Sequence, residues 1–436
     1  MGVNQQNHLF FTRSLITVLC LFSGVFVARY SLLYGSKPSS AYATIDSLLT
    51  RHDFFAARDY YSANKGLLGK LERLLAGARI DNQFNRLDGS HRQIARLLRQ
   101  YGSRLGDSIT CKLLELEVVN LSRTGRYGKA AKASQTLVSR YAPYLTPSEL
   151  DDHQTTRIIW QSLSGTPRQK IAPHADVRLP LVKDKVGLLN LWAHQGTDSC
   201  LFVFDTGANM SVVNETMADR FGMEYMDSSI YVNAITGIKV KSRIAVCGHF
   251  RLGCVDIRHA YFLVFPDTAL AFPQIDYQIH GIIGFPVIEG LKEIIVGKDH
   301  LTIPARSSAS MEPNLALDFL TPVIRINGDS YTFDTGAKTS ILYPLYYHKY
   351  VKDGDTPYPV KKQKFGGAGG SVEKDVHPVD FEGTVSGRHF LLKEVSAFAE
   401  PFGPGESDYF GNVGQDLIQQ LGSMTINFEK MFVRFD

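Results

Sequence analysis

The chain has 436 residues, of which 44% are apolar and 21% charged, and its formal net charge is +4. This length and composition predict two to four domains with sizeable cores and exclude a disordered chain. The small net charge, with no long run of like charges, argues against nucleic acid as a partner.

The five cysteines are too few for a disulfide-dense scaffold, and none of them shows Cys-x-x-Cys spacing. We expect buried or unpaired thiols. The alternative is one bridge between Cys247 and Cys254 across a hairpin.

Residues 1–43 predict export. Arg13 precedes an apolar run at 14–28 that suits the core of a signal peptide and is short for a membrane span of about 20 residues. Ala-Tyr-Ala at 41–43 has the small-x-small form of a cleavage site, but it lies far downstream, so an uncleaved membrane anchor is an alternative. A buried N-terminal helix is a third interpretation. Export would place the protein in the periplasm, on a membrane or outside the cell.

Residues 44–165 have a helical pattern, since Gly and Pro are sparse and apolar residues recur three and four apart. Three segments within this range repeat. Their aligned positions are Phe54, His91 and Tyr127, followed three residues later by Ala57, Ile94 and Ala130. The Gly125, Tyr127 and Ala130 positions resemble those of a tetratricopeptide repeat, which implies an array of helical hairpins. Such an array could bind a protein partner, brace the rest of the chain or act as an inhibitory prosegment.

The remaining sequence has the short apolar runs and turn residues typical of β-strands, and it is internally duplicated. Residues 306–314 form a Ser/Pro/Ala-rich linker between residues 166–305 and 315–436. Asp-Thr-Gly occurs in each part, at 205–207 and at 334–336. Gly-Ile-Ile-Gly (GIIG) at 281–284 and Gly-Asn-Val-Gly (GNVG) at 411–414 follow at nearly equal distances. The two parts are therefore predicted to be copies of one β domain.

The duplicated Asp-Thr-Gly sequence resembles the aspartic peptidases, over about 270 residues from near 166 to the end. Within that family, the retropepsin branch is similar in having Ala after Asp-Thr-Gly, here Ala208 and Ala337, and in a sequence like Gly414-Gln415-Asp416. The pepsins are similar in a different respect, because they too carry both halves in one chain. The resemblance implies a multidomain protein: a helical segment, then a bilobal β fold of the acid-protease type with pseudo-two-fold symmetry. A monomer would be sufficient for catalysis.

By the same resemblance, Asp205 and Asp334 are the expected catalytic residues, and Thr206, Gly207, Thr335 and Gly336 are expected to support them. Two carboxylates that meet across an axis share one proton, so one activates a water and the other stabilises the oxyanion. The GIIG and GNVG segments would thread beneath the two Asp-Thr-Gly loops. Asn412 departs from the aliphatic residue expected there.

Ala208 and Ala337 replace residues whose hydroxyl favours an ionised carboxylate in pepsins, so we expect activity at mildly acidic to neutral pH. An extended polypeptide substrate would be covered by hairpin flaps at 231–243 and 364–376. The flap residues expected to contact it are Ile235, Thr236, Gly237, Gly366, Gly367 and Gly369.

No motif suggests zinc or a serine nucleophile, and no cofactor is expected. Two alternatives to a peptidase remain open from the sequence. One is an inactive peptide-binding protein of the same fold, and the other is a helical-repeat scaffold with an accessory β domain.

Overall fold

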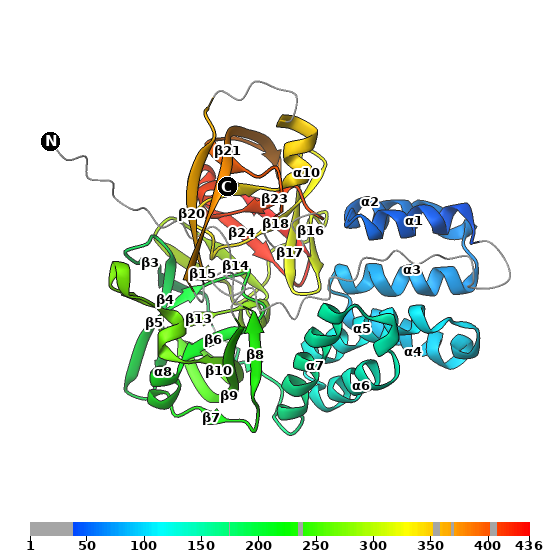
Figure 1. Ribbon diagram of the computed structural model, residues 1–436, viewed down its shortest axis with the longest axis horizontal. Coiled ribbons are helices and arrows are strands. Elements are labelled where there is room, and N and C mark those ends of the chain that lie inside the picture. Colours follow the sequence, from blue (N-terminus) through cyan, green and yellow to red (C-terminus); the bar gives the residue numbers. More distant parts are fainter. Residues whose placement is uncertain (1–37, 174, 234–238, 352–357, 368–369, 402–407) are drawn as a thin grey trace.

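The computed structural model describes residues 38–173, 175–233, 239–351, 358–367, 370–401 and 408–436. A helical array forms one flank of the molecule, and a large β-rich region forms the other (Figure 1). The array contains seven helices: α1 (Ser40–Thr50), α2 (Phe54–Asn64), α3 (Lys70–Gln83), α4 (Leu87–Tyr101), α5 (Asp107–Arg123), α6 (Tyr127–Arg140) and α7 (Pro147–Ser162).

Local sequence explains where these helices begin. Before α7, the Thr146 hydroxyl accepts a hydrogen bond from the Glu149 amide at 3.2 Å, and the Glu149 carboxylate accepts one from the Thr146 amide at 2.7 Å. This capping box, with Pro147 in the first turn, fixes the start of the helix. Short 3-10 turns follow α2, α4 and α6, at Lys65–Leu67, Gly102–Arg104 and Ala142–Tyr144.

The predicted register of the repeat is wrong in its middle copy. Phe54 and Tyr127 begin α2 and α6, whereas His91 lies one turn inside α4, which begins at Leu87. The residue equivalent to Ala57 and Ala130 is therefore Ser90, not Ile94. All three of these small residues are fully buried. The first residues of α2 and α4 are 33 residues apart, and those of α4 and α6 are 40 apart. The helical hairpins therefore differ in length, and the repeat has no uniform period.

In its described residues, the first β unit contains a ten-stranded sheet and a separate two-stranded sheet, β11–β12. Its strands run in the order β1-β10-β6-β13-β5-β4-β9-β7, with β3 on β4 and β8 on β9. Their bounds are β1 (Lys170–Ile171), β3 (Val182–Lys183), β4 (Leu189–Gln195), β5 (Asp198–Phe204), β6 (Ser211–Asn214), β7 (Glu224–Tyr225), β8 (Ile230–Asn233), β9 (Lys239–Leu252), β10 (Val255–Phe265), β11 (Ala271–Phe272), β12 (Tyr277–Gln278) and β13 (Gly281–Ile283). Helices α8 (Glu215–Arg220) and α9 (Phe285–Gly290) follow β6 and β13.

The second β unit is an eight-stranded sheet in the order β16-β17-β18-β23-β19-β22-β21-β20. Its strands are β16 (Leu315–Asp318), β17 (Thr321–Ile326), β18 (Asp329–Phe333), β19 (Ile341–Leu342), β20 (Lys361–Gly367), β21 (Gly370–Val385), β22 (Arg388–Ala397) and β23 (Gly411–Val413). Helices α10 (Pro344–Tyr346) and α11 (Gln415–Leu421) follow β19 and β23.

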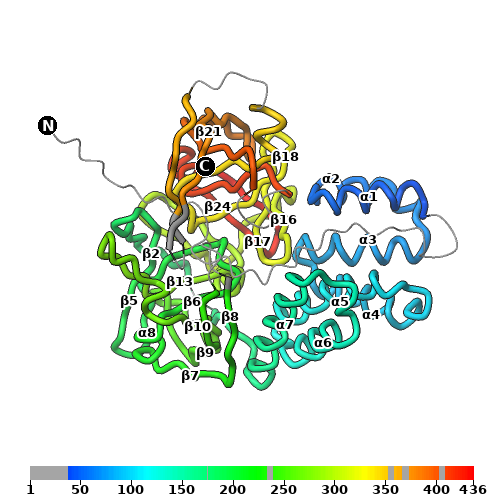
Figure 2. The backbone as a smooth tube through the Cα atoms, in the orientation of Figure 1, coloured from blue at the N-terminus to red at the C-terminus, as the bar shows by residue number. Residues whose placement is uncertain are grey.

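A five-stranded joining sheet connects the two β units, in the order β2-β15-β14-β24-β25. Its strands are β2 (Val177–Pro180), β14 (Glu293–Val296), β15 (His300–Ile303), β24 (Met424–Asn427) and β25 (Phe432–Phe435). Strands β14 and β24 pair antiparallel through Glu293↔Asn427 to Val296↔Met424. Each unit thus contributes one hairpin to the sheet. The backbone trace in Figure 2 shows the two β units one above the other, with the helical array beside them.

The bridge between Cys247 and Cys254 is not formed. Cys247 lies on β9 opposite Ala260 of β10, while Cys254 is exposed in the turn between these strands. Both thiols are free, as are Cys111 and Cys200. The long β9–β10 hairpin separates the pair, because its register carries Cys247 well away from the turn.

Residues 1–37 lie outside the described residues, so the apolar run at 14–28 does too. Within the part of the chain that the structure describes, no helix is long and apolar enough to cross a membrane. Ala41 and Tyr42, from the expected cleavage sequence, are buried in the first turn of α1. Among the described residues, the first helix therefore starts at Ser40, four residues before the expected boundary.

Candidate active site

Each Asp-Thr-Gly loop lies above a strand that threads between its two arms. In the first β unit, β13 pairs parallel with β5 and antiparallel with β6. In the second, β23 pairs parallel with β18 and antiparallel with β19. The Asp205 amide donates to the Ile283 carbonyl at 3.1 Å, and the Asp334 amide donates to the Val413 carbonyl at 2.9 Å. The GIIG and GNVG segments are thus the threaded strands, as expected.

The two threonines bind the loops to each other. The Thr206 amide donates to the Thr335 hydroxyl at 3.0 Å, and the Thr335 amide donates to the Thr206 hydroxyl at 2.9 Å. The Thr335 hydroxyl also donates to the Phe204 carbonyl at 3.0 Å. Both threonines are fully buried. Because neither side chain can turn to water, these bonds fix the position of one loop relative to the other.

Each carboxylate lies against the glycine of the opposite loop. A Cβ atom on Gly207 would stand 2.6 Å from Cγ of Asp334, and one on Gly336 would overlap the carboxylate of Asp205. Only glycine allows this approach. Asp205 is 0% exposed and Asp334 is 3% exposed. The carboxylates therefore face each other's loops in a site with little access to bulk water.

Backbone amides of each loop bind its own carboxylate. The Asp205 Oδ1 atom accepts from the amides of Gly207 at 2.9 Å and Ala208 at 3.0 Å. The Asp334 Oδ1 atom accepts from the Gly336 amide at 2.7 Å. Ala208 and Ala337 contribute no hydroxyl to the carboxylates, as the sequence predicts.

Two serines that the sequence analysis missed support the loops from below. Ser211 and Ser340 each lie six residues after the aspartate of their loop, and each hydroxyl accepts from the last glycine of a threaded segment, Gly284 or Gly414, at 3.0 Å. Both are buried. Their identical offset from the two Asp-Thr-Gly sequences was the signal that could have revealed them.

The second loop has additional polar support. Asp416 accepts from the Ser340 amide at 2.8 Å and from its hydroxyl at 2.6 Å, and burial raises the pKa of the Asp416 carboxyl. The Gln415 side-chain amide donates to the Thr335 carbonyl at 2.8 Å. Phe285 and Pro286 occupy the matching positions after Gly284, so this polar support belongs to one loop.

Asn412 is accommodated by a hydrogen bond. It lies opposite Thr332 of β18, and the Thr332 hydroxyl donates to the Asn412 Oδ1 atom at 2.7 Å. The matching pair in the first unit is Ile282 and Val203, which is apolar. A bonded polar pair thus replaces an apolar pair in the same register.

Both expected flaps are hairpins in their described parts. Strands β8 and β9 pair from Ile230↔Ser242 to Asn233↔Lys239, and β20 and β21 pair from Lys361↔Val376 to Gly367↔Gly370. Gly366 and Gly367 are the last residues of β20. Ile235, Thr236, Gly237 and Gly369 lie outside the described residues.

The described residues contain no group of three or more His, Cys, Asp or Glu side chains arranged to hold a metal ion. What the site offers instead is a pair of buried carboxylates. Such a pair can hold one proton between its members and can activate a water.

Comparison with known proteins finds a family model, described as "Aspartyl protease", that matches residues 193–287. This range contains Asp205 and the GIIG strand of the first β unit. No curated protein matches the chain. Among solved structures, the chain is similar to a retropepsin-like aspartic protease from Rickettsia conorii, at 16% sequence identity and a TM-score of 0.21, covering 31% of this chain and 91% of that chain. The family match supports aspartic peptidase activity, and hence a hydrolase, for the unit that carries Asp205.

Proposed function

We propose that this chain is an exported aspartic endopeptidase that uses Asp205 and Asp334 together to hydrolyse peptide bonds. One observation carries the proposal: each buried carboxylate lies against the glycine of the opposite loop, and Thr206 and Thr335 bind the two loops reciprocally. The family match supports the same activity for the first unit.

The mechanism follows from the burial of this pair. Two adjacent carboxylates cannot both ionise cheaply, so one proton is shared between them. The ionised group takes a proton from a water between them, and that water attacks the peptide carbonyl. The protonated group donates a hydrogen bond to the developing oxyanion. Both roles belong to the pair and are not assigned to single residues.

The substrate in this proposal is an extended polypeptide bound beneath the β8–β9 and β20–β21 hairpins. An extended chain can add main-chain hydrogen bonds to such hairpins while alternate side chains enter pockets. Because Ala208 and Ala337 supply no hydroxyl to the carboxylates, we expect a pH optimum in the mildly acidic to neutral range. An optimum below about pH 3 would refute this part.

The feature that favours the alternative, an inactive peptide-binding protein, is Asn412, a polar residue where an aliphatic one is expected. The hydrogen bond from Thr332 accommodates this residue without loss of the threaded strand. A binding protein would also have no need for two buried carboxylates, whose desolvation is costly.

The test is cleavage of a mixed peptide library by the protein across pH, compared with Asp205→Asn and Asp334→Asn variants and with a statine-type transition-state mimic. Loss of cleavage in either variant, and inhibition by the mimic, is the expected result. Asp329→Asn is a matched control, since Asp329 also lies in the second unit but pairs with Lys349 at the surface. A folded protein that binds peptides at every pH without cleaving them would refute the proposal.

The export part of the proposal rests on the apolar run at 14–28 and is tested separately. A fusion of residues 1–43 to a reporter that is active only outside the cytoplasm should be active. A charged substitution within the run should abolish that activity, and an inactive fusion would refute export.

A further inference from the structure

A cavity of about 570 Å³ lies where the helical array meets both β units. The array contributes Val119 and Trp160, the first unit Tyr261 and Phe285, and the second unit Phe319. Cavities of this size hold small molecules in many proteins. This one is separate from the carboxylate pair, and neither Asp205 nor Asp334 lines it.

One wall of the cavity is aromatic. Tyr127 and Trp160 stack with ring centroids 5.8 Å apart and an interplanar angle of 5°. Tyr261 meets both rings edge-on, at 5.7 Å and 5.9 Å. Such a surface favours an apolar guest with a flat or branched body.

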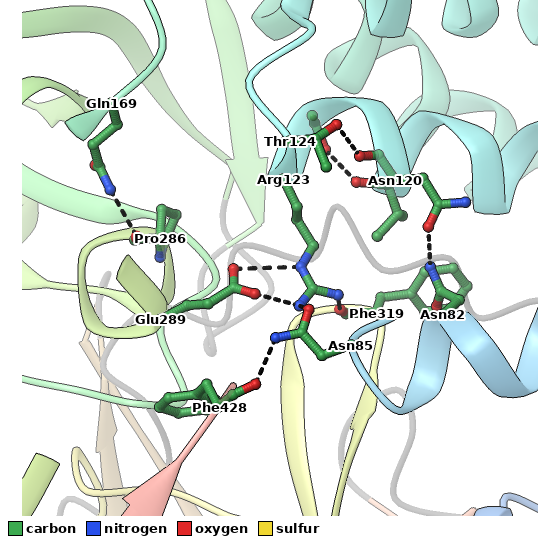
Figure 3. Close-up of polar contacts among 12 residues, drawn as sticks. Asn82, Asn85, Asn120, Arg123, Thr124, Gln169, Pro286, Glu289, Phe319 and Phe428 are labelled. Carbon is green, nitrogen blue, oxygen red and sulfur yellow. Dashed lines mark hydrogen bonds and ion pairs between the residues drawn. The ribbon is translucent and has the colours of Figure 1, made fainter. Parts of the chain in front are cut away.

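Trp160 and Gln169 both line the cavity, and each carries a buried polar atom that has no hydrogen-bond partner within the described residues. These atoms are Nε1 of Trp160, a donor, and Oε1 of Gln169, an acceptor. The Gln169 side chain is held in place, because its Nε2 atom donates to the Pro286 carbonyl at 2.8 Å (Figure 3). Buried polar atoms are nearly always paired in folded proteins, so the protein leaves one donor and one acceptor unsatisfied beside the cavity.

The charges on the lining leave an excess of positive groups. The acids are already paired: Glu289 with Arg123 at 2.5 Å, as Figure 3 shows, and Glu429 with Lys292 at 3.6 Å. Arg168 and Lys170 are exposed on the lining, and neither forms an ion pair with any residue that the structure describes. An anionic group would therefore be favoured at the open side of the cavity.

The cavity also adjoins the first Asp-Thr-Gly loop. Met210, two residues beyond Ala208, lines it, as do Phe285 and Pro286 at the start of α9. The Phe285 amide donates to the Ala208 carbonyl at 2.8 Å. A guest that shifts Met210 or Phe285 would thus act on the loop that holds Asp205.

We propose that this cavity binds a small amphipathic carboxylate, with its apolar body against the Tyr127, Trp160 and Tyr261 wall and its anionic end near Arg168 and Lys170. Binding changes the activity of the carboxylate pair through Met210 and Phe285. This second statement rests on the proposed function, whereas the binding site does not.

The chain has two tryptophans, which makes binding directly measurable. Trp192 is 43% exposed and lies outside the cavity, so a Trp192→Phe variant leaves Trp160 as the single tryptophan, which is excited selectively at wavelengths that tyrosine does not absorb. We would titrate this variant, in an Asp205→Asn background, with pyrene butyrate, which accepts energy from tryptophan. Saturable quenching at one site is expected. Pyrene butanol, which lacks the charge, should bind about tenfold or more weakly.

Arg168→Gln combined with Lys170→Gln should weaken pyrene butyrate binding by about tenfold and leave pyrene butanol unchanged. These residues are exposed, so the fold is retained. The matched control is Arg92→Gln with Lys132→Gln, two exposed cations on α4 and α6, which should change neither affinity. Absence of saturable quenching, equal affinity for both probes, or equal weakening in the control would overturn the site.

Activity is then measured in the protein with an intact Asp205. A change in kcat/KM that saturates with the same affinity as the quenching supports the coupling, and binding without a change in kcat/KM overturns it. Because quenching is measured without turnover, failure of the proposed peptidase activity would leave the binding result readable on its own.

Discussion

The reciprocal threonine bonds can be tested by deleting one hydroxyl at a time. In Thr335→Val, the Thr206 amide loses its acceptor and the Phe204 carbonyl loses a donor. A buried unsatisfied donor costs about 1–3 kcal/mol, and a lost neutral hydrogen bond costs about 0.5–1.5 kcal/mol, so the free energy of unfolding should fall by about 2–4 kcal/mol. Thr206→Val removes only the acceptor of the Thr335 amide. Its expected cost is therefore smaller, about 1–3 kcal/mol.

The assay is urea unfolding of both variants and the parent, followed by kcat/KM on a cleaved peptide. Thr335→Ser is the control, since it keeps the hydroxyl and should retain most of the stability and activity. Equal losses in the two valine variants would contradict the asymmetry seen here. A serine variant as damaged as Thr335→Val would show that packing of the methyl group, not the hydrogen bonds, holds the loops together.

Three further predictions follow from other contacts. Gly336→Ala should place a methyl group against the Asp205 carboxylate and lower kcat/KM by at least about a hundredfold while the protein still folds. Arg123→Met should leave Glu289 without its ion pair and lower the free energy of unfolding by about 3 kcal/mol, measured by urea unfolding. Burial raises the pKa of Asp152 to about 7, so the folded state keeps a proton that the unfolded chain releases. Stability should therefore fall between about pH 4 and 7, by at most about 4 kcal/mol, and Asp152→Asn should remove this fall.

Two of these predictions have a control variant, and the third has a result that would contradict it. Gly248→Ala on β9, where an added Cβ meets open space, should leave kcat/KM unchanged. Arg126→Met breaks a more exposed pair with Asp88 and should cost less than about 1 kcal/mol. An Asp152→Asn variant whose stability still falls with pH as steeply as that of the parent would contradict the assignment to Asp152.

The sequence was most informative where the chain repeats itself. Two Asp-Thr-Gly sequences, each followed at a matching distance by a glycine-flanked segment, indicated that one β domain is duplicated. The resemblance to aspartic peptidases then implied that these segments thread beneath the loops. The same comparison, carried six residues past each aspartate, would have found Ser211 and Ser340. A residue that recurs at the same distance from both Asp-Thr-Gly sequences can be identified in a single sequence, without an alignment of homologues.

Other features had no local signal. The register of the helical array failed at His91 because successive hairpins differ in length. The Arg123 to Glu289 ion pair joins residues 166 positions apart, and neither residue belongs to a repeated motif. Contacts of this kind depend on how helices and strands pack in three dimensions, so no local sequence pattern marks the residues that form them.

Arg123 also bears on the role of the helical array. Its guanidinium contacts Glu289 of the first β unit, the Phe319 carbonyl of the second, and Asn85, whose side chain donates to the Phe428 carbonyl (Figure 3). One side chain of α5 thus connects both β units directly.

The core continues through the same junction. Apolar residues of α1 to α5 belong to one buried cluster with residues of both β units, and residues of α5 to α7 share a second cluster with Ala208 and Met210 beside the first Asp-Thr-Gly loop. A carboxylate pair assembled from two units requires a fixed distance between them, so these contacts favour a brace over a separate partner module or a removable prosegment. Deletion of residues 38–165 would uncover this apolar surface. We therefore expect the deletion to abolish folding, whereas a prosegment would predict a folded product with higher activity.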